Sequence, residues 1–352
     1  MTTLVSHPLD FTLDPGHEAH EPPEASALRR DDVRLLVSPG AATPIDASFH
    51  ELGRFLAAGD LLVINTSATI PAALDGQLPD GEPIVIHLSG ELPGAVWLVE
   101  PRAPREGTTA PLRLEHPTDI SLLAGGTIRL LTPFAESQRL WLARPELARP
   151  VLDYAAEHGR PIRYRHVPDE WPIRDYQTVF AREPGSAEMP SASRPFTTDV
   201  VTDLVARGVL ITPLVLHTGV SSLEGGERPY PERYRVRTTT AAAINATRER
   251  GGRVIAAGTT VVRALATVTD DRGVAHPGEG WTDIVVSPDR PMTGADGLLT
   301  GWHEPESSHL MMLEAFAPHR VLADAYRAAL ERGYLWHEFG DSHLILREAG
   351  TA

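Results

Sequence analysis

Two histidines and three glutamates gather in residues 300–316, TGWHEPESSHLMMLEAF, beside an apolar run. A helical zinc site needs two histidines four residues apart, with a glutamate between them, on one turn of a helix. Here His303 and His309 are six residues apart, and Pro305 between them would break a helix that carried both. The spacing disfavours a metal site and favours acid–base chemistry by His303 or Glu304.

The proline also predicts how this segment is divided. His303 is expected on a loop at the exit of a strand, because apolar residues precede it and the proline follows soon after. Ser307 or Ser308 is suited to cap the next helix, since serine hydroxyls accept the free N–H groups of a first turn. An ionisable group at a strand exit can meet a ligand, whereas Glu306 and His309 are expected at the surface.

A second candidate lies in residues 253–265, RVIAAGTTVVRAL, where a short apolar strand runs directly into a helix. The strand is expected to end at Gly258 and the helix to begin at Thr259 or Thr260. Open α/β sheets bind ligands at the carboxyl ends of their strands, and free N–H groups at a helix start attract carboxylates and phosphates. The threonines either bind such a ligand or only cap the helix. The spacing is not that of a dinucleotide-binding glycine motif.

Two further turns carry ionisable groups. In residues 214–222, LVLHTGVSS, His217 lies at a strand exit beside Gly219, where it can face a cleft or bond to a nearby carbonyl. In residues 339–346, FGDSHLIL, Asp341 follows a glycine, which is a common turn pattern. Either residue alone is a weak indication of a functional site.

The composition excludes several kinds of chemistry. The 352 residues contain no cysteine, and the 32 lysine and arginine residues are all arginine. Without cysteine there is no thiol nucleophile, disulfide, iron–sulfur cluster or cysteine-ligated zinc. Without lysine there is no Schiff base and no P-loop lysine.

The formal charge of −15 argues against broad nucleic-acid binding, which depends on the neutralisation of phosphates. This charge is compatible with a local arginine patch that binds one RNA. Residues 160–174, RPIRYRHVPDEWPIR, form the best such patch, and a solvated loop is the alternative. No apolar stretch approaches the ~20 residues of a membrane helix, and the N-terminus lacks the pattern of a signal peptide. We therefore expect a soluble, cytoplasmic protein.

The order of the expected elements indicates the fold class. Residues 60–66, DLLVINT, form a continuous apolar run typical of a strand covered on both faces. Short β-type runs separated by turns follow at 83–88, 95–101, 111–115, 126–131 and 139–144, and then a helical connector at 145–159. After residue 176, helices alternate with strands: helices at 197–208, 238–252, 259–268, 307–316 and 321–333, strands at 209–219, 253–258, 281–288 and 337–346. Such alternation is typical of an α/β fold.

We therefore predict an α/β protein with a split, barrel-like α/β domain formed by residues 1–72 and 160–352. A small antiparallel β-barrel domain, residues 73–159 with the helical connector, is inserted into it. The barrel is inferred from the run of short strands without an intervening helix. The strand at 60–66 would belong to the sheet of the larger domain, on the other side of the insertion from its remaining strands.

Several of these segments, in the same order along the chain, resemble the S-adenosylmethionine:tRNA ribosyltransferase-isomerase family of queuosine biosynthesis. The similar segments are DLLVINTSATIPAALDG, YQTVFA, LHTG, ERYRV, VIAAGTTVVRALA, LLTGWHEPESSHLMMLEAF and FGDSHLIL. Because they are collinear over most of the chain, the resemblance is far more specific than any single motif. The family's fold, a split α/β domain with an inserted β-barrel, looks like the one inferred from the pattern of elements.

The resemblance implies a reaction in which S-adenosylmethionine donates a ribosyl group instead of a methyl group. The ribose is transferred to a 7-aminomethyl-7-deazaguanine base in tRNA and rearranged, which forms epoxyqueuosine and releases adenine and methionine. No metal is implied, and no cofactor beyond S-adenosylmethionine as the substrate. A proton donor would help adenine to leave, and a carboxylate would stabilise positive charge on the ribose.

The resemblance also implies roles for individual residues. The candidates for proton donation and charge stabilisation are His303, Glu232 and Asp341. The residues expected to bind S-adenosylmethionine lie in the turns described above: His217, Gly219, Gly258, Thr259, Thr260 and Thr300. The residues expected to contact tRNA lie in or just after the arginine-rich segment: Arg165, Arg174, Tyr176 and Gln177.

Some positions depart from the family pattern where its members bind donor and RNA. The histidine of an Ala-Ala-Pro-Thr-Ala-Gly-Leu-His-Phe-like block is replaced by Arg194 or Pro195, depending on the alignment. In residues 298–316, Gly301 stands for an asparagine and Glu306 for a lysine, which reverses a charge. The alternatives are a divergent paralogue acting on another nucleoside or sulfonium substrate, a non-catalytic nucleoside- or RNA-binding protein and, more distantly, a metal hydrolase.

Overall fold

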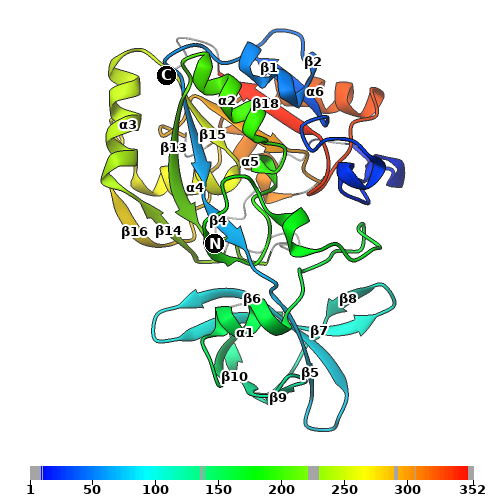
Figure 1. Cartoon of the computed structure of the whole chain (residues 1–352). Helices are drawn as coiled ribbons and strands as arrows, with labels where there is room; N and C mark the ends of the chain where they lie inside the picture. The colour runs from blue at the N-terminus through cyan, green and yellow to red at the C-terminus, as the bar shows by residue number, and fades with distance from the viewer. Residues whose placement is uncertain are drawn as a thin grey trace.

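The computed structural model describes residue 9 and residues 11–134, 137, 139–220, 230–288, 292–305 and 307–347. Two sheets dominate it (Figure 1): a mixed sheet of nine strands that carries the long helices, and a small barrel at one end of the molecule. The chain enters the barrel after β4 (Ser67–Thr69) and leaves it through α1 (Val151–His158). The glutamate at position 306, expected at the surface, lies outside the described residues.

The nine-stranded sheet has the order β16-β14-β13-β3-β15-β17-β18-β1-β2. Its strands are β1 (Arg34–Pro39), β2 (Ile45–Ser48), β3 (Leu61–Asn65), β13 (Leu210–Leu216), β14 (Glu232–Val236), β15 (Val254–Ala257), β16 (Gly278–Thr282), β17 (Gly297–Gly301) and β18 (Ser342–Leu346). The central strands β13, β3, β15 and β17 run parallel to one another. Within the described part of the chain no pairing joins β16 to β2, so this sheet has two edges.

Both faces of this sheet are covered, as β3 shows. Leu61 and Val63 pack into one hydrophobic core, while Leu62 and Ile64 pack into another core on the opposite face. The first core also contains residues of the helices α3 (Thr238–Glu249), α4 (Thr259–Val268), α5 (Ser308–Glu314) and α6 (His319–Glu331), and the second contains residues of α2 (Thr198–Ala206). A strand buried on both faces carries apolar residues at every position, which explains the run LLVI.

The helices of the nine-stranded sheet occur in the predicted order, and two of them begin at a side-chain cap. In chain order, the helices are α2 (Thr198–Ala206), α3 (Thr238–Glu249), α4 (Thr259–Val268), α5 (Ser308–Glu314) and α6 (His319–Glu331). Thr197 caps α2 by accepting the N–H of Val200 at 3.2 Å, and Ser307 caps α5 by accepting the N–H of His309 at 3.3 Å. None of the helices in the described ranges is long and apolar enough to span a membrane.

The smaller sheet closes into a barrel because β11 pairs with β7 as well as with β10. Its antiparallel strands are β5 (Ala73–Gln77), β6 (Pro83–Leu92), β7 (Val96–Arg105), β8 (Thr108–Pro111), β9 (Asp119–Leu122), β10 (Thr127–Pro133) and β11 (Trp141–Glu146). β8 pairs with β7 outside the closed ring. Side chains of β9 are alternately exposed and buried, so one face of the strand fills the interior.

A short parallel pair, β4 and β12 (Glu183–Ser186), links the segments that flank the barrel. The connecting segments contain short 3-10 helices, including η2 (Pro23–Ser26), η4 (Ile173–Tyr176) and η5 (Ser191–Ser193). In Figure 1, β4 lies between the larger sheet and the barrel.

The predicted fold class, α/β with a small antiparallel β-barrel, is confirmed. Two predicted strands are wrong. Most of PLRLE, residues 111–115, lies outside any strand, because the hairpin partner of β7 is the preceding Thr108–Pro111. Most of WTDIVVSP, residues 281–288, also lies outside, because β14 pairs with the less apolar Gly278–Thr282. In both cases the position of the strand is set by pairing with a neighbouring strand, which local hydrophobicity does not reveal. The bounds of the two domains stay a prediction.

Candidate functional site

The strand directions bring the predicted exits to one edge of the large sheet. Since β3, β13, β15 and β17 are parallel, their carboxyl ends lie at the same edge. His217 follows β13, Thr259 follows β15 and His303 follows β17. β18 runs antiparallel to β17, so Asp341, just before β18, lies at this edge too. Residues far apart in the sequence therefore share the edge where α/β sheets bind ligands.

Asn65, at the carboxyl end of β3, connects these exits. Its side-chain Nδ2 donates to the carbonyl of Leu216 at 2.8 Å and to the Thr260 hydroxyl at 3.4 Å. Its Oδ1 accepts the N–H groups of Leu216 at 3.1 Å and Ser67 at 3.0 Å. Asn65 was not among the residues expected at the site. The only signal in the sequence was a polar residue directly after the apolar run LLVI, and the structure shows that this residue is fully buried.

Gly258 shapes the turn from β15 into α4. Its φ of +105° lies in the region that residues with a Cβ rarely adopt, and it is the N-cap of the helix. Thr259 and Thr260 form the first turn of α4, as predicted. The N–H groups of this turn point along the helix axis toward the shared edge, where they suit an anion. Donor binding by Gly258, Thr259 and Thr260 stays a prediction.

Glu232 ties the LHTG turn to α4. Its Oε1 accepts the N–H of Gly219 at 3.0 Å, and its Oε2 forms an ion pair with the Arg263 guanidinium. Both charged side chains are about 10 % exposed. Burial raises the pKa of Glu232, and the charge of Arg263 opposes this rise. Both carboxylate oxygens of Glu232 already hold protein groups in position. A catalytic role for Glu232 stays a prediction.

His217 faces a small polar cavity. Its Nδ1 lies 2.7 Å from the Ser67 hydroxyl, so its partner is a side chain and not the backbone carbonyl considered from the sequence. Burial, followed by the charges of Arg233 and Arg235, lowers the pKa of His217 to about 4, which keeps the ring neutral. The cavity of about 290 Å³ is lined by His217, Arg233, Arg235 and Arg182 among others.

His303 lies on the loop after β17, as predicted, and forms a local cluster. Its Nε2 is 2.8 Å from the hydroxyl of Thr300, and its ring stacks on His309 with centroids 4.7 Å apart. The expectation that His309 lies at the surface is therefore wrong, because α5 begins so close to the strand exit that its first turn covers His303. Burial, then the charges of His309 and His343, holds the pKa of His303 well below its usual value.

Asp341 holds backbone in place. Its carboxylate accepts the N–H of Arg34 at 2.7 Å and that of Leu335 at 2.8 Å, and the side chain is almost fully buried. Burial outweighs these two bonds and raises the pKa of Asp341 to about 6. The residue thus joins the start of β1 to the turn after α6. Its catalytic role stays a prediction.

The four residues expected to contact tRNA divide into two kinds. Arg165 and Arg174 are exposed, and the Arg174 side chain is 83 % accessible. Tyr176 is buried against Phe339, with ring centroids 5.2 Å apart. Gln177 bonds to both the N–H and the carbonyl of Thr69, at 3.1 and 2.7 Å. Only the two arginines therefore present their polar groups outward.

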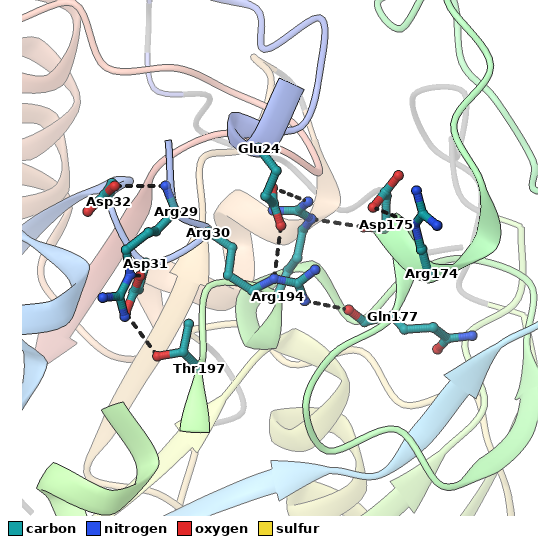
Figure 2. Close-up of polar contacts among 10 residues, drawn as sticks. All are labelled: Glu24, Arg29, Arg30, Asp31, Asp32, Arg174, Asp175, Gln177, Arg194 and Thr197. Carbon is teal, nitrogen blue, oxygen red and sulfur yellow. Dashed lines mark hydrogen bonds and ion pairs between the residues drawn. The ribbon is translucent and has the colours of Figure 1, made fainter. Parts of the chain in front are cut away.

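Arg194, one of the two residues that could stand where the family pattern has a histidine, is a buried anchor for residues 11–32, the N-terminal arm (Figure 2). Its guanidinium donates to the carboxylate of Glu24 at 2.8 Å and to the carbonyl of Asp175 at 3.0 Å. Arg30 bonds to the same carboxylate at 3.0 Å and to the carbonyl of Gln177 at 2.9 Å. The network fixes the arm against the segment that follows the arginine-rich stretch.

Of the residues named at the shared edge, only His217 lines one of the two cavities. Besides the 290 Å³ cavity at His217, a cavity of about 460 Å³ lies between the barrel and residues 160–176. His303, Thr259 and Asp341 line neither of them. Among the residues that the structure describes, no group of three or more histidines and carboxylates is placed to hold a metal ion.

Comparison with known proteins identifies close relatives over the whole chain. Residues 6–345 match a family described as queuosine biosynthesis protein. The S-adenosylmethionine:tRNA ribosyltransferase-isomerase of Moorella thermoacetica is 37 % identical over 356 residues, covering 96 % of this chain and 98 % of that one. The protein of the same name from Symbiobacterium thermophilum is 35 % identical, with 96 % and 99 % covered.

A solved structure is also similar. The crystal structure of S-adenosylmethionine tRNA ribosyltransferase from Thermotoga maritima aligns with 96 % of this chain and 99 % of its own. The TM-score is 0.53 and the identity 28 %. The alignment extends over both the nine-stranded sheet and the barrel, since it covers nearly every residue.

Proposed function

The chain belongs to the queuosine biosynthesis protein family, as its motifs predicted, and we propose that it is an S-adenosylmethionine:tRNA ribosyltransferase-isomerase. The observation that carries this proposal is the extent of the similarity. Relatives with that name are 35 to 37 % identical over almost the full length of both chains, barrel included.

The proposed reaction uses S-adenosylmethionine as a ribosyl donor and a 7-deazaguanine base of tRNA as the acceptor. Epoxyqueuosine forms in the tRNA, while adenine and methionine leave. The reaction needs no metal and no cofactor besides the donor. We place the protein in the cytoplasm, where tRNA is available.

We assign the donor to the shared edge of the large sheet. The first turn of α4, at Thr259 and Thr260, offers N–H groups that suit the methionine carboxylate. Asn65 supports the assignment, because its bonds fix the exit of β13 relative to the Thr260 hydroxyl. Gly219 lies in the next turn along this edge, held by the Glu232 carboxylate. S-adenosylmethionine that bridges the exits of β13 and β15 would contact both turns without movement of either strand.

His303 suits the role of a proton acceptor or neutral hydrogen-bond partner better than that of an imidazolium donor. The low pKa of His303 keeps the ring uncharged at neutral pH, and the Thr300 hydroxyl orients it. A neutral imidazole beside a sulfonium substrate adds no repulsive charge. Positive charge that develops on the ribose would then be stabilised at a distance by the negative charges of Glu232 and Asp341, whose oxygens are already bound by protein groups.

We assign the RNA to the exposed side of the arginine-rich segment. Arg165 and Arg174 present guanidinium groups to solvent, as phosphate contacts require. Tyr176 and Gln177 support this surface from below, Tyr176 through its ring contact with Phe339 and Gln177 through its hydrogen bonds to Thr69. The overall charge of −15 requires that RNA contacts stay local.

The deciding experiment measures adenine released from S-adenosylmethionine in the presence of tRNA that carries 7-aminomethyl-7-deazaguanine. We expect release that depends on the modified base, with unmodified tRNA as the control. The absence of adenine at high enzyme concentration, with both substrates bound, would refute the proposal.

A divergent paralogue is the second candidate, and the charge reversal at position 306 and the buried Arg194 favour it. In that case another nucleoside or sulfonium compound would stabilise the protein in a thermal-shift panel, and S-adenosylmethionine would not. A non-catalytic binding protein would keep its biological activity in the variants His303→Ala and Asp341→Ala.

A further inference from the structure

A cavity of about 460 Å³ lies between the barrel and residues 160–176, and none of the residues assigned to the donor lines it. Its walls come from strands β5 and β6, the β7–β8 hairpin and the arginine-rich segment after α1. We call it the barrel pocket. Its volume falls within the ~300–1,000 Å³ typical of sites for small molecules.

The hairpin wall of the barrel pocket is held rigidly from inside the barrel. Arg102 donates to the hydroxyl and the carbonyl of Thr109, a lining residue, at 2.7 and 2.9 Å. The same guanidinium donates to the carboxylate of Glu100 at 2.9 Å, and Arg139 donates to that oxygen at 2.9 Å. All three charged side chains are at most 10 % exposed. The hairpin therefore presents Arg105 from a fixed base.

The opposite wall is also fixed. The backbone of Arg160 exchanges two hydrogen bonds with Ala73 of β5, at 2.9 and 3.0 Å. Gly159 makes this approach possible, because a Cβ there would lie 2.0 Å from the carbonyl oxygen of Pro71. The Arg160 side chain pairs with Asp75 at 2.9 Å. The segment that carries Trp171 thus starts from a point anchored on the barrel.

The lining combines cations with aromatic rings. Arg160 is neutralised by Asp75, but Arg105 is exposed and makes a long, 3.4 Å bond to the carbonyl of Pro104. The guanidinium of Arg163 donates one hydrogen bond to the carbonyl of Pro168, and its other end lies 3.9 Å from the Glu170 carboxylate, so its charge has no carboxylate within hydrogen-bond distance among the described residues. The half-buried indole of Trp171 lies on the same side. Arginine beside an aromatic ring is how proteins bind single-stranded nucleotides.

Two lining residues also carry buried polar atoms that have no hydrogen-bond partner among the described residues. They are Arg160 Nη1 and Trp171 Nε1, whereas Nδ1 of the lining residue His87 lies 3.7 Å from the Glu100 carboxylate inside the barrel. Buried polar atoms are nearly always paired in native proteins, and unpaired ones are typical of places where a partner comes from outside. Their gathering around one cavity supports a polar ligand.

We propose that the barrel pocket binds one nucleotide of single-stranded RNA, with the base against Trp171 and the phosphate between Arg105 and Arg163. The inference rests on the proposed function in one respect, namely that the RNA is a loop of tRNA beside the modified base. The pocket would hold a neighbouring nucleotide and so position the acceptor at the sheet edge. Each base stacked on an aromatic side chain contributes substantially to affinity without strict sequence preference.

The test measures the Kd of a fluorescently labelled RNA hairpin, the anticodon stem–loop of a tRNA. Binding is followed by fluorescence anisotropy in the absence of S-adenosylmethionine. We expect Trp171→Ala to raise the Kd by about tenfold or more, and Trp171→Phe, which keeps a ring, by a few-fold at most. Arg105→Ala should raise the Kd at low salt and reduce the slope of log K against log salt by about one. Arg144→Ala, an exposed arginine on β11 outside the lining, is the matched control and should change neither.

A second measurement on the unaltered protein protects the test against misfolded variants. RNA hairpins with 4-thiouridine in the loop are cross-linked, and the cross-linked peptide is identified by mass spectrometry. A cross-link to residues 160–176 is expected, whereas cross-links confined elsewhere, or variants that keep the Kd of the unaltered protein, would overturn the inference.

The outcomes also separate this inference from the proposed reaction. A protein that binds the hairpin through Trp171 but releases no adenine would refute the reaction and retain the pocket. One that releases adenine while Trp171→Ala binds RNA normally would refute the pocket alone.

Discussion

At the scale of single residues, the environment of each ionisable group decides what it can do. His303 is partly buried and Asp341 is buried at the same edge, yet loss of solvent drives their pKa values in opposite directions. The charged form is the costly one in each case, so the imidazole is kept neutral and the carboxyl is protonated more readily. The two residues therefore need separate tests.

For His303 we expect that His303→Gln lowers the rate of adenine release by about 100-fold or more, with little change in donor affinity. Because the pKa is low, the neutral form that accepts a proton persists well below pH 6. Titration of His303 should therefore leave the rate of the unaltered enzyme level from pH 8 to pH 6, and a fall near pH 6 would report protonation of Asp341, whose pKa is about 6. A rate that instead rises as the pH falls through this range would identify an imidazolium donor.

For Asp341 the test is the pH dependence of the free energy of unfolding. Its pKa is raised from 3.8 to about 6, so the folded state binds the proton more tightly than the unfolded state. Stability from the protonated form is present below pH 4 and is lost as the pH rises to about 6, by up to about 3 kcal/mol. Urea unfolding of the unaltered protein and of Asp341→Asn should diverge in this window. Parallel pH profiles would contradict the assignment.

At the scale of elements, glycine and paired charges set the two turns that we assign to the donor. The α4 turn depends on the backbone of Gly258, and the LHTG turn depends on the carboxylate of Glu232. The α4 turn depends on a backbone conformation and the LHTG turn on a buried ion pair. Substitutions in the two turns should therefore lower stability and donor binding for different reasons.

Gly258→Ala should lower the free energy of unfolding by about 1–3 kcal/mol, because a residue with a Cβ is strained at a φ of +105°. The atoms nearest to a Cβ at position 258 would be 3.5 Å away, so backbone strain and not a steric clash causes the loss of stability. Donor affinity should fall as well, since the N–H groups of the first turn would be displaced. Gly333→Ala, at a φ of +67° after α6, is the matched control. It should lose stability and leave donor affinity unchanged.

Glu232→Gln should destabilise the protein by about 3 kcal/mol or more, because Arg263 would remain charged and buried without its partner. The double variant Glu232→Gln, Arg263→Met should recover much of the stability. Comparing adenine release in the two variants then separates the roles. Recovered stability with recovered activity would show that Glu232 only positions the turn.

At the scale of the whole molecule, the N-terminal arm is joined to the rest by charges that are far apart in the sequence. Arg194 lies 170 residues after Glu24 and is almost fully buried beneath it. A double-mutant cycle with Glu24→Gln and Arg194→Met should give a coupling energy of about 1–3 kcal/mol in urea unfolding. The exposed helical pair Arg207 and Asp203 is the control and should give about 0.3–0.5 kcal/mol. Equal couplings would mean that the arm is not anchored here.

The sequence alone was sufficient for features that depend on local pattern. The alternation of apolar runs and helices determined the α/β fold class. It limited the cap of α5 to Ser307 or Ser308 and the start of α4 to Thr259 or Thr260, and the structure has Ser307 and Thr259. Collinear motifs determined the family. These features are encoded within a few residues of one another, so no distant partner is needed to recognise them.

Tertiary structure alone decided which polar groups are free to act. Asp341 looked available in the sequence, but its oxygens are bound by backbone from β1 and from the turn after α6. His309 looked exposed until the start of α5 placed it on His303. Asn65 and the barrel pocket had no signature of comparable strength. The physical reason is that burial and hydrogen-bond partners come from segments up to hundreds of residues away, and a pattern of neighbours along the chain carries no record of them.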